Sequence, residues 1–135
     1  MKFDEERKRR YRSKVGYILE KMYALPDTAS VVDDLVVDGI LYRVQTSIDA
    51  AMDMAAMLVR DIGIDVSEDY NNIEILCKNE IIDINLADDL KKLNGMRNAI
   101  VHKYGSVDTQ LVLQNLENIK EILRNFIEII EGELA

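Results

Sequence analysis

The sequence predicts an all-α protein, an up-and-down bundle of about five helices that forms one domain over residues 1–135. Three observations support a single helical domain. A chain of 135 residues is close to the commonest domain size and can bury one sizeable core. One proline and six glycines are few for the turns that a sheet requires. The apolar residues recur at helical spacing in successive segments of the chain.

The first two helices are separated by a short stretch that begins with the only proline. The first helix is expected over residues 3–25, because Pro26 ends its apolar pattern. The second is expected within residues 31–63, with a bend at Gly39. Its N-cap candidates carry side-chain oxygens that can accept from the first backbone N–H groups of the helix: Asp27, Thr28 and Ser30.

Three further helices are expected over residues 68–79, 84–104 and 109–130. Ser67, Asp83 and Asp108 precede them and are the predicted N-caps. Gly105 is expected to end the fourth helix, since glycine accepts the left-handed conformation common after a helix C-terminus.

The apolar and sulfur-containing residues are expected to serve the core. One stripe of the second helix should face it: Leu41, Val44, Ile48, Met52, Ala55, Val59 and Ile62. Three methionines of the same helix are interpreted as core or interface residues rather than a cofactor pocket: Met52, Met54 and Met57. The single cysteine, Cys77, lies in an apolar run, so a buried thiol is expected and an internal disulfide is excluded.

Composition and motifs exclude several classes of protein. No run of residues is apolar enough for a membrane span, and the first ten residues lack the core of a signal peptide, so a cytoplasmic protein is expected. The common phosphate-loop, dinucleotide, zinc-protease and serine-hydrolase motifs are missing. With one histidine and one cysteine per chain, neither a metal site nor a cofactor is expected.

The charge is distributed unevenly along the chain. The net charge is −8, yet seven lysines and arginines against three acids give residues 1–14 a local charge of +4. This segment could contact RNA phosphates or an acidic partner, with these arginines as candidates: Arg7, Arg9, Arg10 and Arg12. The alternative is that it only forms the solvated first turns of a helix.

The stretch RNAIVHKYG, residues 97–105, is the main candidate site. On a helix, Arg97 and Tyr104 would point within about 20° of each other, and Asn98 and His102 within about 40°. Arg97 would share its side with apolar neighbours, and a buried arginine requires a counter-charge or a cleft.

These residue types suit cleavage of RNA without a metal ion. Histidine can take and return protons near neutral pH, and arginine can grip a phosphate through two parallel hydrogen bonds. His102 would handle a proton, Arg97 would stabilise charge on the phosphate during attack by the ribose 2'-hydroxyl, and Asn98 could orient His102. One histidine supplies only one proton-transfer group, so a two-fold homodimer is expected to supply the second. Alternatively, His102 only caps a helix.

The pattern R-N-x-x-V-H-x-Y, formed by Arg97, Asn98, Val101, His102 and Tyr104, resembles the R-x-x-x-x-H-x-Y signature of HepT-like proteins in the HEPN superfamily. The resemblance extends over nearly the whole chain, including LADDLKKLNGMRNAIVHKYGSVD and the last amphipathic helix. It implies a helical homodimer that acts as a metal-independent ribonuclease toxin of a type VII toxin–antitoxin system, paired with a minimal nucleotidyltransferase antitoxin.

Carried onto this chain, the resemblance implies that Arg97 and His102 are catalytic, with Asn98 as the polar residue after the arginine. Tyr104 matches the tyrosine that the partner adenylylates to silence the toxin. Asp49 departs from the family pattern, which tends to have glutamate there, so a supporting role for its carboxylate is in doubt. Two alternatives stay open: a non-catalytic HEPN module that binds a nucleotide or regulates a nucleotidyltransferase, and an inert helical dimer.

Overall fold

The structure, a computed structural model, describes residues 3–29, 33–102 and 109–135. These residues form six α-helices and no strand, which confirms the all-α prediction. The helices are α1 (Glu5–Tyr23), α2 (Asp34–Asp61), α3 (Asp69–Lys78), α4 (Ile84–His102), α5 (Thr109–Gln114) and α6 (Leu116–Leu134).

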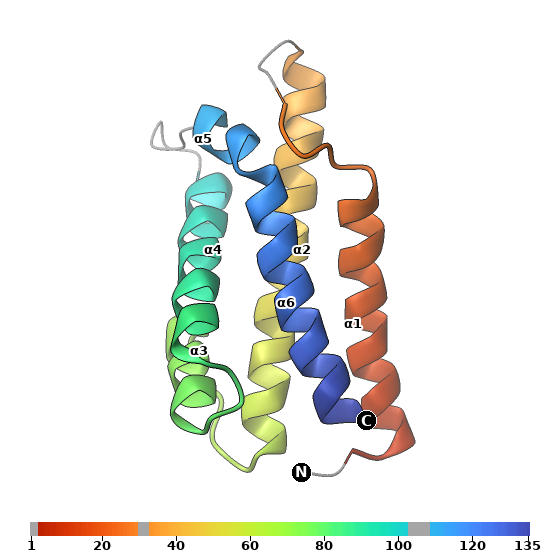
Figure 1. The fold of residues 1–135 in the computed structure, drawn as a ribbon, viewed down its shortest axis with the longest axis vertical. Coiled ribbons are helices and arrows are strands. Elements are labelled where there is room, and N and C mark those ends of the chain that lie inside the picture. The colour runs from red at the N-terminus through yellow and green to blue at the C-terminus, as the bar shows by residue number, and fades with distance from the viewer. Residues whose placement is uncertain (1–2, 30–32, 103–108) are drawn as a thin grey trace.

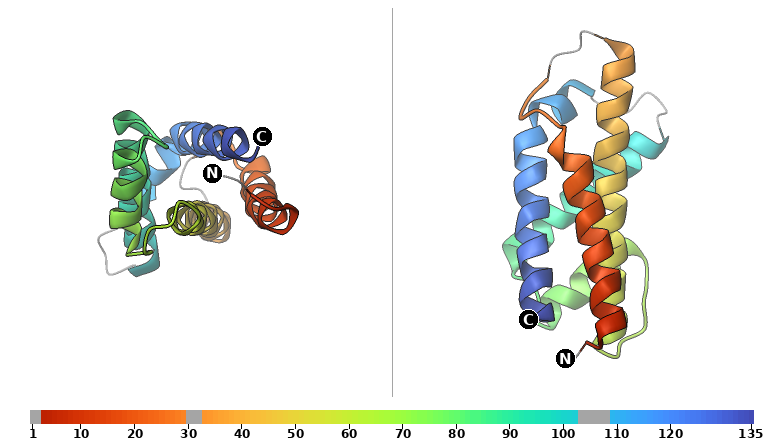
Figure 2. Two further views of the ribbon diagram at one scale, coloured as in Figure 1. Left: turned by 90° about the horizontal axis from the view of Figure 1, so that it is seen from below. Right: turned by 90° about the vertical axis from the view of Figure 1, so that its right-hand side faces the viewer.

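Helix α2 is central to the bundle, because α1, α3, α4 and α6 all pack against it. The long helices alternate in direction, so both chain termini lie at the same end of the molecule (Figure 1). Viewed along the bundle, α1 lies on one side of α2, while α3 and α4 lie on the other (Figure 2). The short helix α5 lies at the opposite end from the termini.

The core confirms most of the apolar predictions. Of the stripe on α2, all residues are buried except Ile62, which is half-buried at the helix end. Met52 and Met54 are buried, and Met57 is half-buried against the core. The prediction for Cys77 was wrong, since its side chain is only half-buried at the edge of the core.

The N-cap predictions for α2 and α3 were wrong. Asp33 caps α2 by accepting from the Leu35 N–H at 2.8 Å. The predicted candidate Asp27 instead packs beside the first turns of α6, where its carboxylate pairs with Lys120 at 2.9 Å. Thr28 precedes the cap by five positions, and Ser30 lies outside the described residues.

The cap of α3 is also one residue from its predicted position. Glu68 accepts from the Asn71 N–H at 2.8 Å, whereas the backbone N–H of Ser67 donates to the Asn72 side chain. The prediction for α4 is confirmed, because Asp83 accepts from the Leu86 N–H at 2.8 Å. The predicted cap Asp108, together with Gly105, lies outside the described residues.

The last predicted helix is in fact two helices. Asn115 interrupts it, and its side-chain amide donates to the Leu111 carbonyl at 2.8 Å, which satisfies a carbonyl at the end of α5. Helix α6 then continues to Leu134 rather than to Ile130, because both of these residues are buried in the core.

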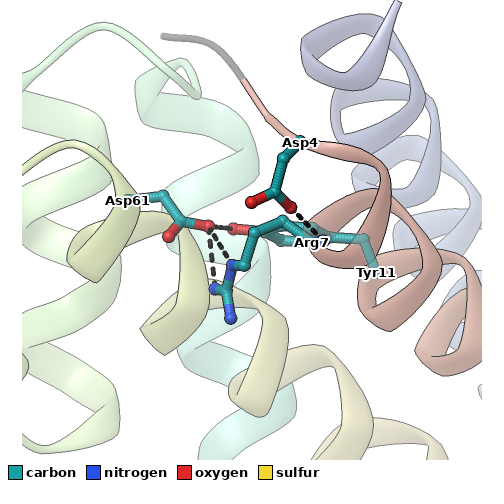
Figure 3. Close-up of polar contacts among 4 residues, drawn as sticks. All are labelled: Asp4, Arg7, Tyr11 and Asp61. Carbon is teal, nitrogen blue, oxygen red and sulfur yellow. Dashed lines mark hydrogen bonds and ion pairs between the residues drawn. The ribbon is translucent and has the colours of Figure 1, made fainter.

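A polar cluster joins the start of α1 to the end of α2 (Figure 3). Asp61 accepts from the Tyr11 hydroxyl at 2.5 Å and from the Arg7 guanidinium at 2.8 Å. Burial, followed by the bond to Asp61, raises the pKa of Tyr11, and the hydrogen bond to Asp61 is the main cause that raises the pKa of Arg7. This cluster of three residues fixes the α1–α2 register at the terminal end of the bundle.

Candidate functional site

The predicted site lies where the last turns of α4 pack against the middle of α2. Arg97 on α4 donates from Nε to the Asp49 Oδ1 atom on α2, at 2.5 Å. The side chains are 29% and 35% exposed, so the pair is half-buried. The counter-charge that the sequence requires for Arg97 is therefore Asp49.

Asn98 also contacts Arg97. Its Oδ1 atom accepts from the Arg97 Nη1 atom at 2.9 Å. The guanidinium is thus held by a carboxylate from α2 and by an amide from its own helix. The sequence predicted a role for Asn98 in orienting His102, and the structure adds a role in orienting the arginine.

His102 is the last described residue of α4, and its side chain is exposed. Because the helix is continuous from Asn98 to His102, the two residues lie one turn apart on the same side, as the spacing predicted. Ile100 points into the core, but Val101 is 40% exposed. The site therefore opens to the surface rather than into the core, and Tyr104 lies outside the described residues.

Two further carboxylates, Asp53 and Asp69, lie close enough to the Arg97–Asp49 pair to take part in its electrostatics. Asp53 lies one turn after Asp49 on α2 and pairs with Lys14 at 2.9 Å. Burial is the main cause that raises the pKa of Asp69, and the charges of Asp53 and Asp49 raise it further, while Arg97 opposes them. The positive charge of Arg97 is thus partly neutralised by its own chain.

A hollow of about 310 Å³ lies beside the Arg97–Asp49 pair, between α1 and α2. Asp49 and Asp53 line it from α2, and Ser13, Lys14 and Tyr17 line it from α1. The hollow thus brings Lys14 of α1 to the same surface as Asp49, the partner of Arg97. Among residues 3–29, 33–102 and 109–135, no group of three or more acidic, cysteine or histidine side chains could hold a metal ion.

The four arginines of α1 have different environments. Arg7 belongs to the Tyr11–Asp61 cluster and is 22% exposed. Arg10 pairs with Glu6 at 3.3 Å on the surface. Arg9 and Arg12 are exposed on other sides of the helix. Only part of the predicted basic segment therefore faces α2.

Sequence reasoning left a supporting role for Asp49 in doubt and did not identify it as the partner of Arg97. The available signal was that a half-buried arginine requires a carboxylate, but α2 also offers Asp53 one turn further along and Asp61 about three turns further along. The choice among them depends on the height at which α4 crosses α2, which the sequence does not reveal. Lys14 was missed for the same reason, because its partner Asp53 is on another helix.

The described part of the chain also contains no helix that combines the length and apolar character required to cross a membrane.

The chain is similar to known proteins over most of its length. The family model described as ribonuclease HepT-like matches residues 17–130. A protein of Archaeoglobus fulgidus named "Putative RNase" is 44% identical over 128 residues, which cover 95% of this chain and 96% of the relative. The "mRNA nuclease HepT" of Shewanella oneidensis is 30% identical over 98 residues, which cover 71% of this chain and 73% of the relative.

Solved structures share the fold at lower sequence identity. A chain in the crystal structure of the toxin–antitoxin MntA–HpeT with AMP-PNP superposes with a TM-score of 0.82 at 21% identity, over 91% of this chain and 98% of that chain. The tri-AMPylated HEPN toxin of Shewanella oneidensis, in complex with its MNT antitoxin, gives a TM-score of 0.73 at 21% identity, over 96% and 99%. At these identities, the likeness concerns the fold.

Proposed function

The chain belongs to the HepT-like ribonuclease family. From this premise we propose that it is a metal-independent endoribonuclease toxin, in which Arg97 and His102 cleave RNA at a cleft between two copies of the chain. The observation that carries the proposal is the half-buried Arg97, held by Asp49, on the same helix end as the exposed His102.

Arg97 stabilises the charge that grows on the phosphate. A guanidinium has five N–H donors in a planar fork, which is more than the bonds to Asp49 and Asn98 require. It can therefore grip two phosphate oxygens while Asp49 holds it in place. Orientation before the reaction matters, because a group that is already positioned needs no reorganisation as the charge develops.

His102 moves the protons. The ribose 2'-hydroxyl gives its proton to one neutral imidazole as its oxygen bonds to phosphorus, and a protonated imidazole donates to the departing 5'-oxygen. The products are a 2',3'-cyclic phosphate and a 5'-hydroxyl end. Because each chain has one histidine, the second imidazole comes from the other copy.

Exposed apolar residues beside the site support a homodimer. Val101 follows Arg97 by one turn and is 40% exposed. Tyr42, 56% exposed, precedes Asp49 by two turns on the same side of α2, and Leu35, 82% exposed, precedes Tyr42 by two more. A contact with a second copy of the chain would cover these exposed apolar side chains.

Tyr104 is proposed to be the regulatory position. It follows His102 by two residues, and a nucleotidyltransferase partner would transfer AMP to its hydroxyl. The seven-residue spacing would put Tyr104 on the side of Arg97 in a helix that continued through residue 104, and the added phosphate would then bring negative charge and bulk to the place where the RNA phosphate has to bind. The AMPylated HEPN toxin among the structures of the same fold supports this proposal.

A second candidate function is a non-catalytic module that binds a nucleotide or regulates a nucleotidyltransferase. The observation that favours it is the acidic surroundings of Arg97, where Asp49, Asp53 and Asp69 weaken attraction for an RNA phosphate. In this alternative, Arg97 contacts a nucleotide but no bond is cleaved.

Cleavage of RNA decides between the two. The purified homodimer should degrade RNA equally well with and without EDTA, and Arg97→Ala and His102→Ala should each abolish degradation while the dimer persists. Lys78→Ala is the matched control, because it removes an exposed cation at the end of α3. Wild-type activity in either site variant would contradict the proposed function.

Modification is tested separately by mass spectrometry. Incubation with the partner nucleotidyltransferase and ATP should increase the intact mass by whole adenylyl units, and Tyr104→Phe should prevent the increase. An unchanged increase in Tyr104→Phe would place the modification elsewhere in the chain.

A further inference from the structure

A second hollow, the α1/α2 pocket, lies between the two helices on the side of Asp53 away from Asp49. It has a volume of about 500 Å³, within the range of small-molecule sites. Four cations line it, namely Arg7, Arg10, Lys14 and Arg60, over apolar side chains that include Met57 and Val66. No carboxylate is among its described lining residues, although the chain as a whole carries a net charge of −8.

The cations of the pocket differ in how firmly they are held. Arg7 is held by Asp61 in the half-buried cluster of Figure 3, so it lines the pocket in a fixed position. Arg10 pairs with Glu6, but the side chains are 60% and 67% exposed. Such exposed pairs contribute little to stability, so Arg10 can exchange its carboxylate for a phosphate at small cost. Lys14 can exchange its partner in the same way, because the side chains of its pair with Asp53 are 40% and 58% exposed.

The pocket adjoins the hollow beside Asp49, the residue that holds Arg97. Ser13 and Lys14 line both the α1/α2 pocket and the hollow that contains Asp49. Along α2, Asp49 and Arg60 are separated by eleven residues, which is roughly 16 Å of helix. Helix α1 accompanies α2 over this distance (Figure 2). An RNA strand that is cut at Arg97 can therefore extend past Asp49, along the surface between α1 and α2, to Arg60.

We propose that the α1/α2 pocket binds a nucleotide of the RNA strand beyond the cleavage site. Arg10, Lys14 and Arg60 bind the phosphates, and a base packs on Met57 and Val66. A single-stranded nucleotide can use both kinds of lining residue, because its phosphates contact the cations and its base packs on the apolar side chains. An acidic protein segment would contact the cations but would leave the apolar side chains without a partner. This inference rests on the proposed function, because it takes the substrate of the site to be RNA.

The pocket narrows the set of α1 arginines that contact RNA. Arg9 and Arg12 do not line it, although the sequence placed them in the same basic segment. Arg60, which the sequence did not single out, does line it, because α2 brings it opposite Arg10.

The experiment measures binding of labelled single-stranded RNA to the full-length homodimer by fluorescence anisotropy, in the His102→Ala background to prevent cleavage. Arg10→Ala with Arg60→Ala should weaken binding of a 12-nucleotide strand roughly tenfold and reduce the salt slope by about 1.4, the loss of two phosphate contacts. Binding of a tetranucleotide that reaches only Arg97 should change less than about twofold.

Matched variants remove the same charge elsewhere. Lys78→Ala with Arg124→Ala, two exposed cations outside the pocket, should leave the affinity for the 12-nucleotide strand unchanged. If Arg9→Ala with Arg12→Ala weakens binding as much as the pocket pair does, the basic face of α1 as a whole binds RNA and the pocket inference is overturned. Identical melting curves for all the double variants verify that each is folded.

The outcomes separate this inference from the proposed function. If the wild-type chain cuts no RNA but binds single-stranded RNA through the pocket cations, the pocket inference is supported and the ribonuclease proposal is overturned. If the Arg10→Ala, Arg60→Ala variant cleaves long RNA normally and with unchanged KM, the ribonuclease proposal is supported and the pocket inference is overturned. A chain that binds no single-stranded RNA, or that binds duplex RNA as tightly as single strands, would overturn the pocket inference.

Discussion

Asp49 is expected to position Arg97 for catalysis, and Asp49→Asn tests this directly. The substitution keeps the size of the side chain and an oxygen that can accept from Arg97 Nε, but it removes the charge. The pair is 29% and 35% exposed, between the surface pairs that contribute up to about 1 kcal/mol and the buried pairs whose disruption costs about 3–5 kcal/mol. We therefore expect the free energy of unfolding to fall by about 1 kcal/mol.

The effect on cleavage should be larger than the effect on stability. Loss of a residue that orients a reacting group lowers activity by about 10- to 100-fold in comparable arrangements. The KM for RNA should stay constant or fall, because Asp49→Asn also removes a negative charge that repels the RNA phosphate. A lower kcat with an unchanged or lower KM is therefore the expected signature of a positioning residue.

Single-turnover cleavage of a labelled oligonucleotide measures this effect, and Asp53→Asn is the control. Asp53 lies one turn along α2, carries the same charge and pairs with Lys14 instead of Arg97. The reasoning is refuted if Asp49→Asn cuts RNA at the wild-type rate while Arg97→Ala is inactive. It is also refuted if Asp53→Asn lowers kcat as much as Asp49→Asn.

Four other variants test separate parts of the structure. Asp61→Ala should lower the free energy of unfolding by about 3 kcal/mol in urea titrations, because it leaves the Tyr11 hydroxyl and Arg7 without their shared half-buried partner; a loss below about 1 kcal/mol would contradict this. Burial raises the pKa of Tyr11, so the unfolded chain loses the proton of the Tyr11 hydroxyl at a lower pH than the folded chain. The free energy of unfolding of the wild type should therefore decline as the pH rises above 10.0, and Tyr11→Phe should lack that part of the decline. The pKa of Asp69 is also raised, so the ionisation of its carboxyl group opposes folding above pH 3.8. Asp69→Asn should therefore melt at a higher temperature than the wild type at pH 7 but not below pH 3.8. An equal difference in melting temperature at the two pH values would argue against the electrostatic cause. Tyr42→Glu should shift a homodimer to monomer in sedimentation experiments and abolish cleavage, whereas Tyr23→Glu, at a 92% exposed residue on the end of α1, should do neither.

Local physics accounts for the parts of the fold that the sequence predicted well. The apolar period located each long helix, and Asp83 was recognised as a cap because a carboxylate directly before a helix satisfies its first N–H groups. Errors arose where several residues could serve equally. Asp27, Thr28 and Ser30 are all acceptable caps by type, but Asp33 caps α2. The break at Asn115 depends on one side-chain bond to a carbonyl, which no apolar pattern reveals.

By itself, the sequence determined the helical class, the apolar stripes and the placement of Arg97, Asn98 and His102 on one helix, because these follow from contacts within a few residues of each other. Only the tertiary structure decided which carboxylate holds Arg97 and which cations face a common pocket. Asp49, Asp53 and Asp61 have similar local sequence environments, and the packing of α1 and α4 on α2 gives each a different partner: Arg97, Lys14 and the Tyr11–Arg7 pair. The physical reason is that charge pairing between helices depends on their relative height and rotation, which are set by the packing of the whole core.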